Sequence, residues 1–254
     1  MPRTIARDEL AAYLDQYLRV ADIPDASPNG LQVQGADQVR LIAYAVDASV
    51  QSMKAATRTR ADMLIVHHGL WWGKHEQIVG NMHRRVSTLI RNNVSLYAAH
   101  LPLDCHPEVG NNAELARLLG ARVERPFATY RGVEVGLIAA LTRAQKREQF
   151  VAAVGKHLET EPTVLAFGPE SVKRVGIVSG AGASAAEEAA RAGCDTLLTG
   201  ETSHSAFHPA REAGINLVFA GHYATETVGL RALQGHLRKR FGVEGTFIAA
   251  PTGF

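Results

Sequence analysis

The chain has 254 residues, of which 46% are hydrophobic and 20% are charged, and its formal net charge is +2. This length allows one large domain or two compact ones with a sizeable core, and the composition is ordinary for a globular protein. The near-balanced charge and the short Lys/Arg clusters argue against nucleic acid and anionic membranes as partners.

Three further features of the sequence favour a cytoplasmic protein. The N-terminal residues carry charges where a secretory signal peptide has an apolar run. No apolar stretch approaches the ~18–20 residues that a bilayer-spanning helix needs. Cys105 and Cys194 are far apart in the sequence and form neither a disulfide framework nor the paired spacing of a structural zinc site.

Strand-like and helix-like segments alternate along the first half of the chain. A helix with one apolar face is predicted over residues 8–18, and a turn over residues 27–30. Short apolar runs that alternate with helices predict a largely parallel sheet covered by helices. The segments that follow the turn are a strand at 41–46, a helix at 50–58, a strand at 63–66, a helix at 83–91 and a strand at 95–99.

The second half repeats this alternation, after a strand at 133–141 and a helix at 146–158. Its elements are a strand at 174–179, a helix at 184–192, a strand at 196–199, a helix at 207–213, a strand at 216–220 and a last strand at 246–249. The α/β pattern therefore predicts a second, similar lobe.

An internal match between the halves indicates a degenerate duplication. Residues 61–66 (ADMLIV) match residues 194–199 (CDTLLT), and Asp62 and Asp195 are interpreted as caps or turn residues. A His-x-x-x-acid pair follows the third strand of each half, at residues 100–104 and 222–226. We predict a first lobe over residues 1–125, which carries His67, His68 and Asp104. The second lobe is predicted over residues 126–254, where the part from about 215 supplies His222 and Glu226.

The pair His67-His68 directly follows an apolar strand, at the end where open α/β sheets bind ligands. Neighbouring strand residues point to opposite faces, so we expect the pair to leave the regular strand at Gly69, where a turn costs little. Each imidazole could then bind a different ion of a close metal pair. A lone histidine is more often structural, but burying two adjacent imidazoles without a task is costly.

Asp104, His222 and Glu226 complete the candidate ligands. Pro102 argues against a helix, so Asp104 is expected on a loop. His222 and Glu226 stand at i and i+4 at the start of a predicted helix that runs to about Lys239, which puts both on one face. Such pairs are commonplace on helices, but the repeated spacing favours a metal site. Imidazole and carboxylate suit zinc, iron, manganese or cobalt, and Glu226 is the candidate to bridge two ions.

Several other side chains near these positions are weaker candidates. Glu201 and His208 occupy the second half's counterpart of the histidine-pair region. Trp71-Trp72 follows the histidine pair and forms either an aromatic wall over a planar substrate or part of the core or a subunit contact. Cys105 is expected to be inert. The histidines expected to be structural or on the surface are His75, His83, His106, His157 and His236.

Taken together, six motifs resemble the Nif-three-like dinuclear metal centre family, whose members include GTP cyclohydrolase type 2 homologues. They are SPNGLQ at 27–32, VHHG at 66–69, AHLPLD at 99–104, GNN at 110–112, TGE at 199–201 and GHYATE at 221–226. The resemblance covers nearly the whole chain, and the length resembles the short family form without a central insertion.

The resemblance implies two divalent ions per chain, held by His67, His68, Asp104, His222 and Glu226, with Glu226 bridging. It also implies that the metal site lies in the cleft between two similar α/β lobes, and that the chain assembles into a toroidal homohexamer.

Two functions remain open at this point. The first is a metal-dependent hydrolase that activates a bridging water, in which His100, Glu201 or His208 moves the proton. The family implies opening of a purine ring, as in GTP cyclohydrolysis, although the sequence carries no P-loop or other nucleotide fingerprint. The second is a non-catalytic metal-binding scaffold or metal-handling protein that acts through partners. An open coordination position on the metals would distinguish a hydrolase from a closed structural site.

Overall fold

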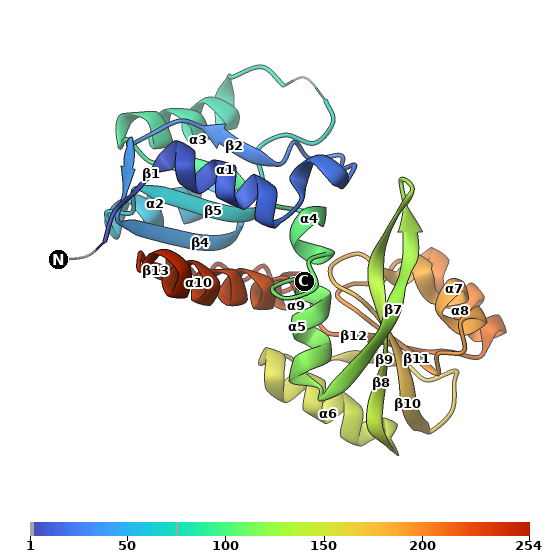
Figure 1. Ribbon diagram of the computed structural model, residues 1–254. Coiled ribbons are helices and arrows are strands. Elements are labelled where there is room, and N and C mark those ends of the chain that lie inside the picture. Colours follow the sequence, from blue (N-terminus) through green and yellow to red (C-terminus); the bar gives the residue numbers. More distant parts are fainter. Residues whose placement is uncertain (1–2, 75) are drawn as a thin grey trace. The chain divides into compact units, whose positions relative to one another are not determined.

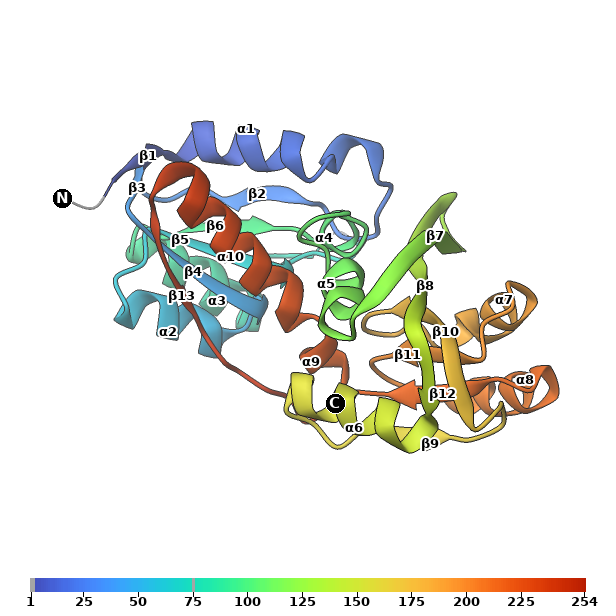
Figure 2. The ribbon, with the colours of Figure 1, turned by 60° about the horizontal axis from the view of Figure 1, so that its bottom comes forward.

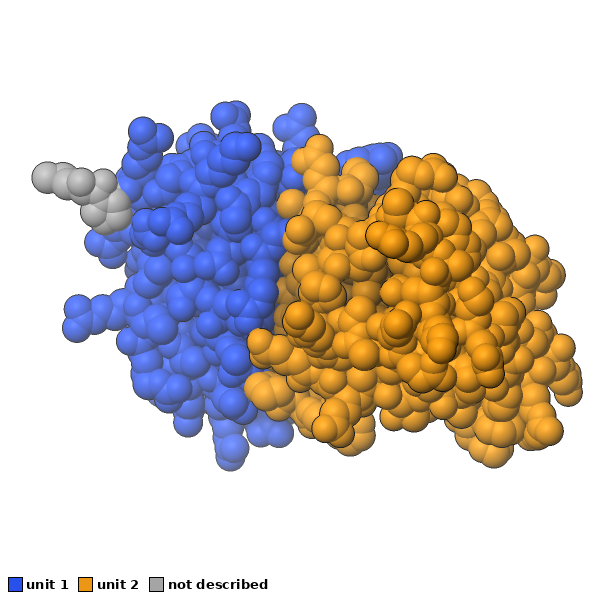
Figure 3. Space-filling view, turned by 90° about the horizontal axis from the view of Figure 1, so that it is seen from below, with its two compact units in different colours: residues 1–103, 230–250 blue, residues 104–229, 251–254 orange. Residues whose placement is uncertain are grey.

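The computed structural model describes residues 3–74 and 76–254, and the chain divides into two compact units (Figure 3). Unit 1 comprises Met1–Leu103 and Leu230–Ala250, and unit 2 comprises Asp104–Gly229 and Pro251–Phe254. This division differs from the predicted boundary near residue 126, because the segment that follows residue 104 packs into the core of unit 2. His75, for which a structural or surface role was expected, lies outside the described residues.

Unit 1 contains a five-stranded sheet formed by β2 (Gly30–Val33), β4 (Leu41–Asp47), β5 (Met63–His68), β6 (Ser95–Ala98) and β13 (Glu244–Phe247). The order is β13-β4-β5-β6-β2, and all neighbours are parallel except β2, which is antiparallel to β6. β1 (Ile5–Ala6) and β3 (Gln38–Val39) form a separate antiparallel pair. Because β13 pairs with β4 through Glu244–Phe247, residues 230–250 return to unit 1. From the sequence, these residues were predicted to belong to the second lobe.

Helices cover both faces of this sheet (Figures 1 and 2). They are α1 (Arg7–Tyr17), the short η1 (Val20–Asp22), α2 (Val50–Arg58), α3 (Gly80–Arg91) and α10 (Thr227–Phe241). α1 and α10 meet through a 2.6 Å hydrogen bond between Tyr13 Oη and His236 Nε2. On the opposite face, Met53 of α2 and Leu89 of α3 pack on the strands, and the side chains of β5 alternate between the two faces. None of the helices in the described part of the chain is long and apolar enough to cross a bilayer.

Gly235 is a helical glycine of α10 whose conformation any residue can adopt. A Cβ added there would meet no heavy atom within 4 Å. Glycine in a helix interior costs roughly 0.5–1 kcal/mol relative to alanine, because it loses more backbone freedom on folding. We therefore expect Gly235→Ala to raise the free energy of unfolding by about that amount, measured by urea denaturation. A variant that is less stable than the wild type would contradict this assignment of α10.

Unit 2 contains a six-stranded sheet with the order β7-β8-β10-β11-β12-β9. The strands are β7 (Ala121–Tyr130), β8 (Val133–Lys146), β9 (Thr163–Leu165), β10 (Ser171–Val178), β11 (Thr196–Thr199) and β12 (Asn216–Phe219). β10, β11 and β12 are parallel, whereas β7, β8 and β9 join by antiparallel pairing. The parallel strands therefore end together at one edge of the sheet.

Two cores lie on the two faces of this sheet. One is formed with α7 (Ala186–Arg191) and α8 (Phe207–Ala213), the other with α5 (Asn111–Leu118) and α6 (Arg147–Leu158). The shorter helices are α4 (Leu101–Asp104), η2 (Ala183–Ala185), η3 (His204–Ala206) and α9 (His222–Thr225). Leu115 and Ala116 of α5 pack in the core with Val175 of β10. The chain therefore enters unit 2 near residue 104, earlier than the boundary predicted from sequence.

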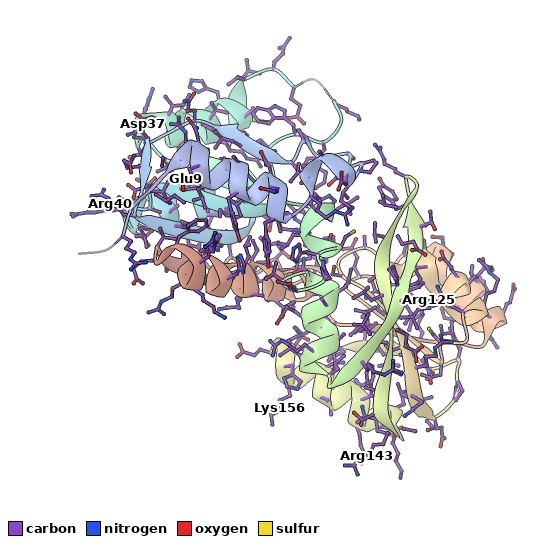
Figure 4. All side chains as sticks on the ribbon, viewed as in Figure 1. Glu9, Asp37, Arg40, Arg125, Arg143 and Lys156 are labelled. Carbon is purple, nitrogen blue, oxygen red and sulfur yellow. The ribbon has the colours of Figure 1, made fainter. Side chains whose placement is uncertain are left out.

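The internal repeat is visible in the hydrogen bonds that one aspartate of each unit accepts from backbone N–H groups. The Asp62 carboxylate accepts hydrogen bonds from the N–H groups of Arg40 and Leu41, and that of Asp195 accepts them from Lys173 and Arg174. Each aspartate directly precedes its own strand and joins it to the neighbouring parallel strand, in agreement with the predicted turn or cap. Arg40 (Figure 4) adds an ion pair of 3.3 Å to Asp62. The predicted α/β class, with two similar lobes, is confirmed.

Candidate metal centre

Three histidines of unit 1 gather at the carboxyl ends of its parallel strands. His67 and His68 end β5, and His100 follows β6 closely. The imidazole centroids are 4.9 Å apart for His67 and His68, 5.0 Å for His67 and His100, and 5.6 Å for His68 and His100. One ring nitrogen of each lies within 4.8 Å of the others. These three side chains could hold a metal ion.

Each of these rings has an oxygen next to its Nδ1. His67 Nδ1 lies 2.9 Å from the carbonyl oxygen of Ala99, and His68 Nδ1 lies 2.8 Å from Asp47 Oδ1. His100 Nδ1 lies 3.0 Å from both oxygens of Asp25. A carbonyl or an ionised carboxylate can only accept, so Nδ1 of each ring donates, and in the neutral form of the ring Nε2 carries the lone pair. This is the arrangement that orients histidine ligands in metal sites.

Asp25 is a nearly buried carboxylate, with a side-chain exposure of 3%. Burial alone would raise its pKa, but hydrogen bonds from His100, Asn29 and the Ser27 N–H, together with the charge of His100, outweigh it. The pKa of Asp25 is therefore held well below its usual range. An ionised Asp25 fixes the orientation of the His100 ring at neutral pH.

Asp104 of unit 2 is held by a buried polar network. Its Oδ1 accepts hydrogen bonds of 2.8 Å from both Asn111 Nδ2 and Ser179 Oγ. Asn111 Oδ1 in turn accepts a 2.9 Å hydrogen bond from the Gly229 N–H, and Asn112 Oδ1 accepts one of 2.8 Å from the Ser179 N–H. Because two donors share one oxygen, the carboxylate of Asp104 has a fixed orientation.

His222 and Glu226 lie on the other side of the turn that follows β10. His222 Nε2 is 3.1 Å from Glu226 Oε1, and its Nδ1 is 3.0 Å from Glu201 Oε2. Gly180, which follows Ser179, faces both side chains: a Cβ there would lie 3.1 Å from His222 Nε2 and would collide with Glu226 Oε1. Ser179 and Gly180 therefore stand between Asp104 and the His222–Glu226 pair, at the carboxyl end of the parallel strands.

The donor set fits a transition metal or zinc. In unit 1, His67, His68 and His100 each have an oxygen at Nδ1. In unit 2, His222 has Glu201 at Nδ1 and the Glu226 carboxylate at Nε2. Nitrogen and oxygen donors of this kind suit zinc, iron, manganese and cobalt. Cys105 Sγ lies 3.7 Å from the Glu134 carbonyl oxygen and does not belong to the ligand groups found in the described residues.

Residues 5–252 match the family model of Duf34/NIF3 (NGG1p interacting factor 3). The chain belongs to the Duf34/NIF3 family. This confirms the resemblance drawn from the sequence motifs.

Curated relatives match this chain over nearly their whole length. A Deinococcus radiodurans protein is 46% identical over 249 residues, which cover 98% of this chain and 95% of the relative. An Archaeoglobus fulgidus protein is 45% identical over 244 residues, 96% of this chain and 98% of the relative. Both are named "GTP cyclohydrolase 1 type 2 homolog".

Solved structures match equally well. The protein ybgI, described as of unknown function, has a TM-score of 0.93 at 38% identity, covering 98% of this chain and 100% of that one. TTHA1606 from Thermus thermophilus has a TM-score of 0.88 at 43% identity, with the same coverage.

Two local predictions for the candidate ligands, one for the pair His67-His68 and one for Asp104, were wrong. His67 and His68 do not leave the strand: β5 runs through both. Gly69 is needed for close approach rather than for a turn, since a Cβ there would collide with the Gln32 side chain and lie 2.9 Å from Ala98 Cβ. Asp104 ends the short helix α4 instead of lying on a loop. Pro102 is tolerated because it stands in the first turn, where its missing N–H has no helical partner anyway.

The expected helix from His222 is interrupted. α9 ends at Thr225, and Glu226 has φ −106° and ψ 0° before α10 begins at Thr227. The i,i+4 spacing still brings the His222 and Glu226 side chains together, as the 3.1 Å contact records.

The two weaker candidates, Glu201 and His208, have different surroundings. Glu201 contacts His222, whereas His208 is exposed on α8 with its ring against Phe207, and no potential ligand group among the described residues includes it. His106 is buried and accepts hydrogen bonds from the N–H groups of Glu108 and Val109, a structural role as expected.

Sequence reasoning missed the residues that orient the ligands, above all Asp25, Asp47 and Ser179. Asp47 had a usable signal, because it ends the strand beside β5 and is in register with His68. Asp25 lies between the predicted helix and the predicted turn, and Ser179 carries no signal beyond its place at the end of a predicted strand.

The pKa of His222 is raised to about 9 in the metal-free chain by its hydrogen bond with Glu226, against the opposing effect of burial; the charge of Glu226 and the contact with Glu201 add to it. A folded-state pKa above the ordinary 6.5 gives stability that is fully present below about pH 6.5 and is lost as the pH rises through about 9. We expect the His222 ring protons of metal-free protein to titrate near 9 by NMR, and the free energy of unfolding to fall over that window. A midpoint near 6.5 would contradict the contact with Glu226.

Proposed function

We propose that the chain is a hydrolase-like protein that depends on a dinuclear metal centre. The residues that would hold the ions are His67 and His68 of unit 1 and Asp104, His222 and Glu226 of unit 2, with Glu226 as the bridging carboxylate that the family resemblance implies. The observation that carries the proposal is the orientation of His67 and His68, whose Nδ1 atoms meet oxygen acceptors and whose Nε2 atoms are thereby directed to a metal. In unit 2 the Nε2 of His222 lies beside Glu226 Oε1, so these two side chains would offer their donor atoms together.

Two divalent ions, when bound, would lower the pKa of a shared water toward neutrality and stabilise developing negative charge. The chain's own residues supply orientation and proton transfer. Asp47 and Glu201 hold the rings of His68 and His222, and the Ser179 hydroxyl holds Asp104. Fixed ligands keep the reacting groups in place without reorganisation.

We assign proton transfer to His100. Asp25 holds its Nδ1, so its Nε2 can accept a proton from the attacking water and return it to the leaving group. Glu201 is engaged by His222, and His208 is exposed on α8, so neither competes for this role.

The reaction we propose is the opening of a purine ring as in GTP cyclohydrolysis, on the strength of the name carried by the relatives. The test incubates metal-loaded protein with GTP and measures formate. We expect formate from the wild type, and none from a His100→Gln variant that retains its metal. A metal-loaded wild type that releases no formate would refute the catalytic proposal and leave a metal-binding scaffold or metal-handling protein.

We also propose a toroidal homohexamer, as the family resemblance implies. The check is the mass of the particle in solution by light scattering. A monomer at micromolar concentration would rule the hexamer out.

A further inference from the structure

The two adjacent tryptophans after β5 have different surroundings. Trp71 packs against the hydrophobic core formed with α2 and α3. Trp72 leaves that core and is 40% exposed, a large value for a side chain of this size and hydrophobicity. Its ring lies instead against the candidate metal centre.

Trp72 contacts two of the three clustered imidazoles. Its ring centroid is 5.0 Å from that of His100, at an interplanar angle of 81°, and 5.5 Å from that of His68. Asp25 and Asp47 fix those two imidazoles through their Nδ1 atoms. The indole is therefore supported on one side by oriented rings while much of its surface remains open to solvent.

Trp72 is therefore an exposed aromatic side chain that borders a polar site. This combination is typical of a surface that receives a ligand. A ligand that meets both an indole and a polar centre needs a flat aromatic body with polar edges.

We propose that Trp72 is a stacking wall that binds the planar heterocyclic ring of the substrate. This inference rests on the proposed function, because it concerns the same site, and it assigns a specificity-determining residue to it. Base–aromatic stacking is worth about 1–3 kcal/mol per base. Loss of the indole should therefore weaken binding of a heterocycle by about 5- to 150-fold.

The test uses metal-loaded protein with two probes, GTP and inorganic triphosphate, which differ by the nucleoside. Dissociation constants are measured by equilibrium dialysis for the wild type, Trp72→Ala, Trp72→Phe and the matched control Trp71→Phe. We expect Trp72→Ala to weaken GTP binding by the stated factor and to leave triphosphate binding unchanged, while Trp72→Phe retains most of the GTP affinity.

Tryptophan fluorescence shows which side chain contacts GTP, because the chain has two tryptophans and each can be removed in turn. GTP should quench the fluorescence of Trp71→Phe, which keeps Trp72, and should leave the fluorescence of Trp72→Phe unchanged. Equal GTP affinity in the wild type and Trp72→Ala, or quenching confined to Trp71, would overturn the inference. Loss of triphosphate binding to the same extent as GTP binding would also overturn it.

Failure of the proposed function has a different signature. If the wild type takes up no metal, or releases no formate, the hydrolase fails whatever the tryptophan variants do. If metal is bound normally and GTP affinity does not depend on Trp72, only the stacking wall fails.

Discussion

Glu226→Gln is expected to bind divalent metal more than about a hundredfold more weakly than the wild type. Replacing even an outer neighbour of a ligand typically costs about 10–100-fold in affinity, and here a negatively charged donor itself is lost. Glu226 is only 3% exposed, so water cannot readily replace it. Titration with Zn²⁺ against a competing chelator measures the affinity.

The same variant separates metal loss from unfolding. Glutamine has the shape of glutamate, so the fold should persist, and the pKa of His222 should fall from about 9 because its main cause is removed. The matched control is Glu212→Gln, which removes an exposed carboxylate of α8 and should leave metal affinity unchanged. Equal metal affinity in Glu226→Gln and wild type would exclude Glu226 as a ligand.

Gly180→Ala is expected to weaken metal binding by more than about tenfold without touching any ligand chemically. A methyl group at this position would push the Glu226 carboxylate aside and crowd His222. Because misplacement of about 1 Å at such a site can cost on the order of a hundredfold in function, tenfold is a conservative expectation. The affinity is measured by the same competition titration.

Gly180 also has φ +61°, a conformation that costs a non-glycine residue about 1–2 kcal/mol. A control variant must therefore separate this loss of stability from the loss of metal affinity. Gly214 has φ +66° with nothing within 4 Å of an added Cβ. Gly214→Ala should therefore lose similar stability while binding metal normally. If Gly180→Ala and Gly214→Ala bind metal with equal affinity, the turn after β10 does not position the ligands.

The parts of the fold that follow from local patterns were predictable from the sequence. β11 and α8 agree with the predicted bounds, and so does α2. Each is a short apolar or amphipathic segment bounded by polar or glycine residues, so its own pattern decides its structure. β7 was missed because its first half carries exposed charges, and its position depends on pairing with β8.

The candidate ligands were predictable because they follow strands, but the residues that orient them through hydrogen bonds were not. Asp25 meets His100 across 75 residues, and Ser179 meets Asp104 across the same separation. Long-range hydrogen bonds leave no periodicity in the sequence. The return of residues 230–250 to unit 1 was missed for the same reason: it depends on the pairing of β13 with β4, whose partners lie far apart in the sequence.

Metal analysis of protein purified without added metal tests the central claim most directly, when wild type, His67→Ala and Glu226→Gln are compared as atoms per chain. We predict about two divalent ions per wild-type chain and a large loss in both variants, although the altered residues belong to different units. A wild type that stays metal-free even after dialysis against Zn²⁺, or a loss confined to the variant of one unit, would contradict a shared dinuclear centre.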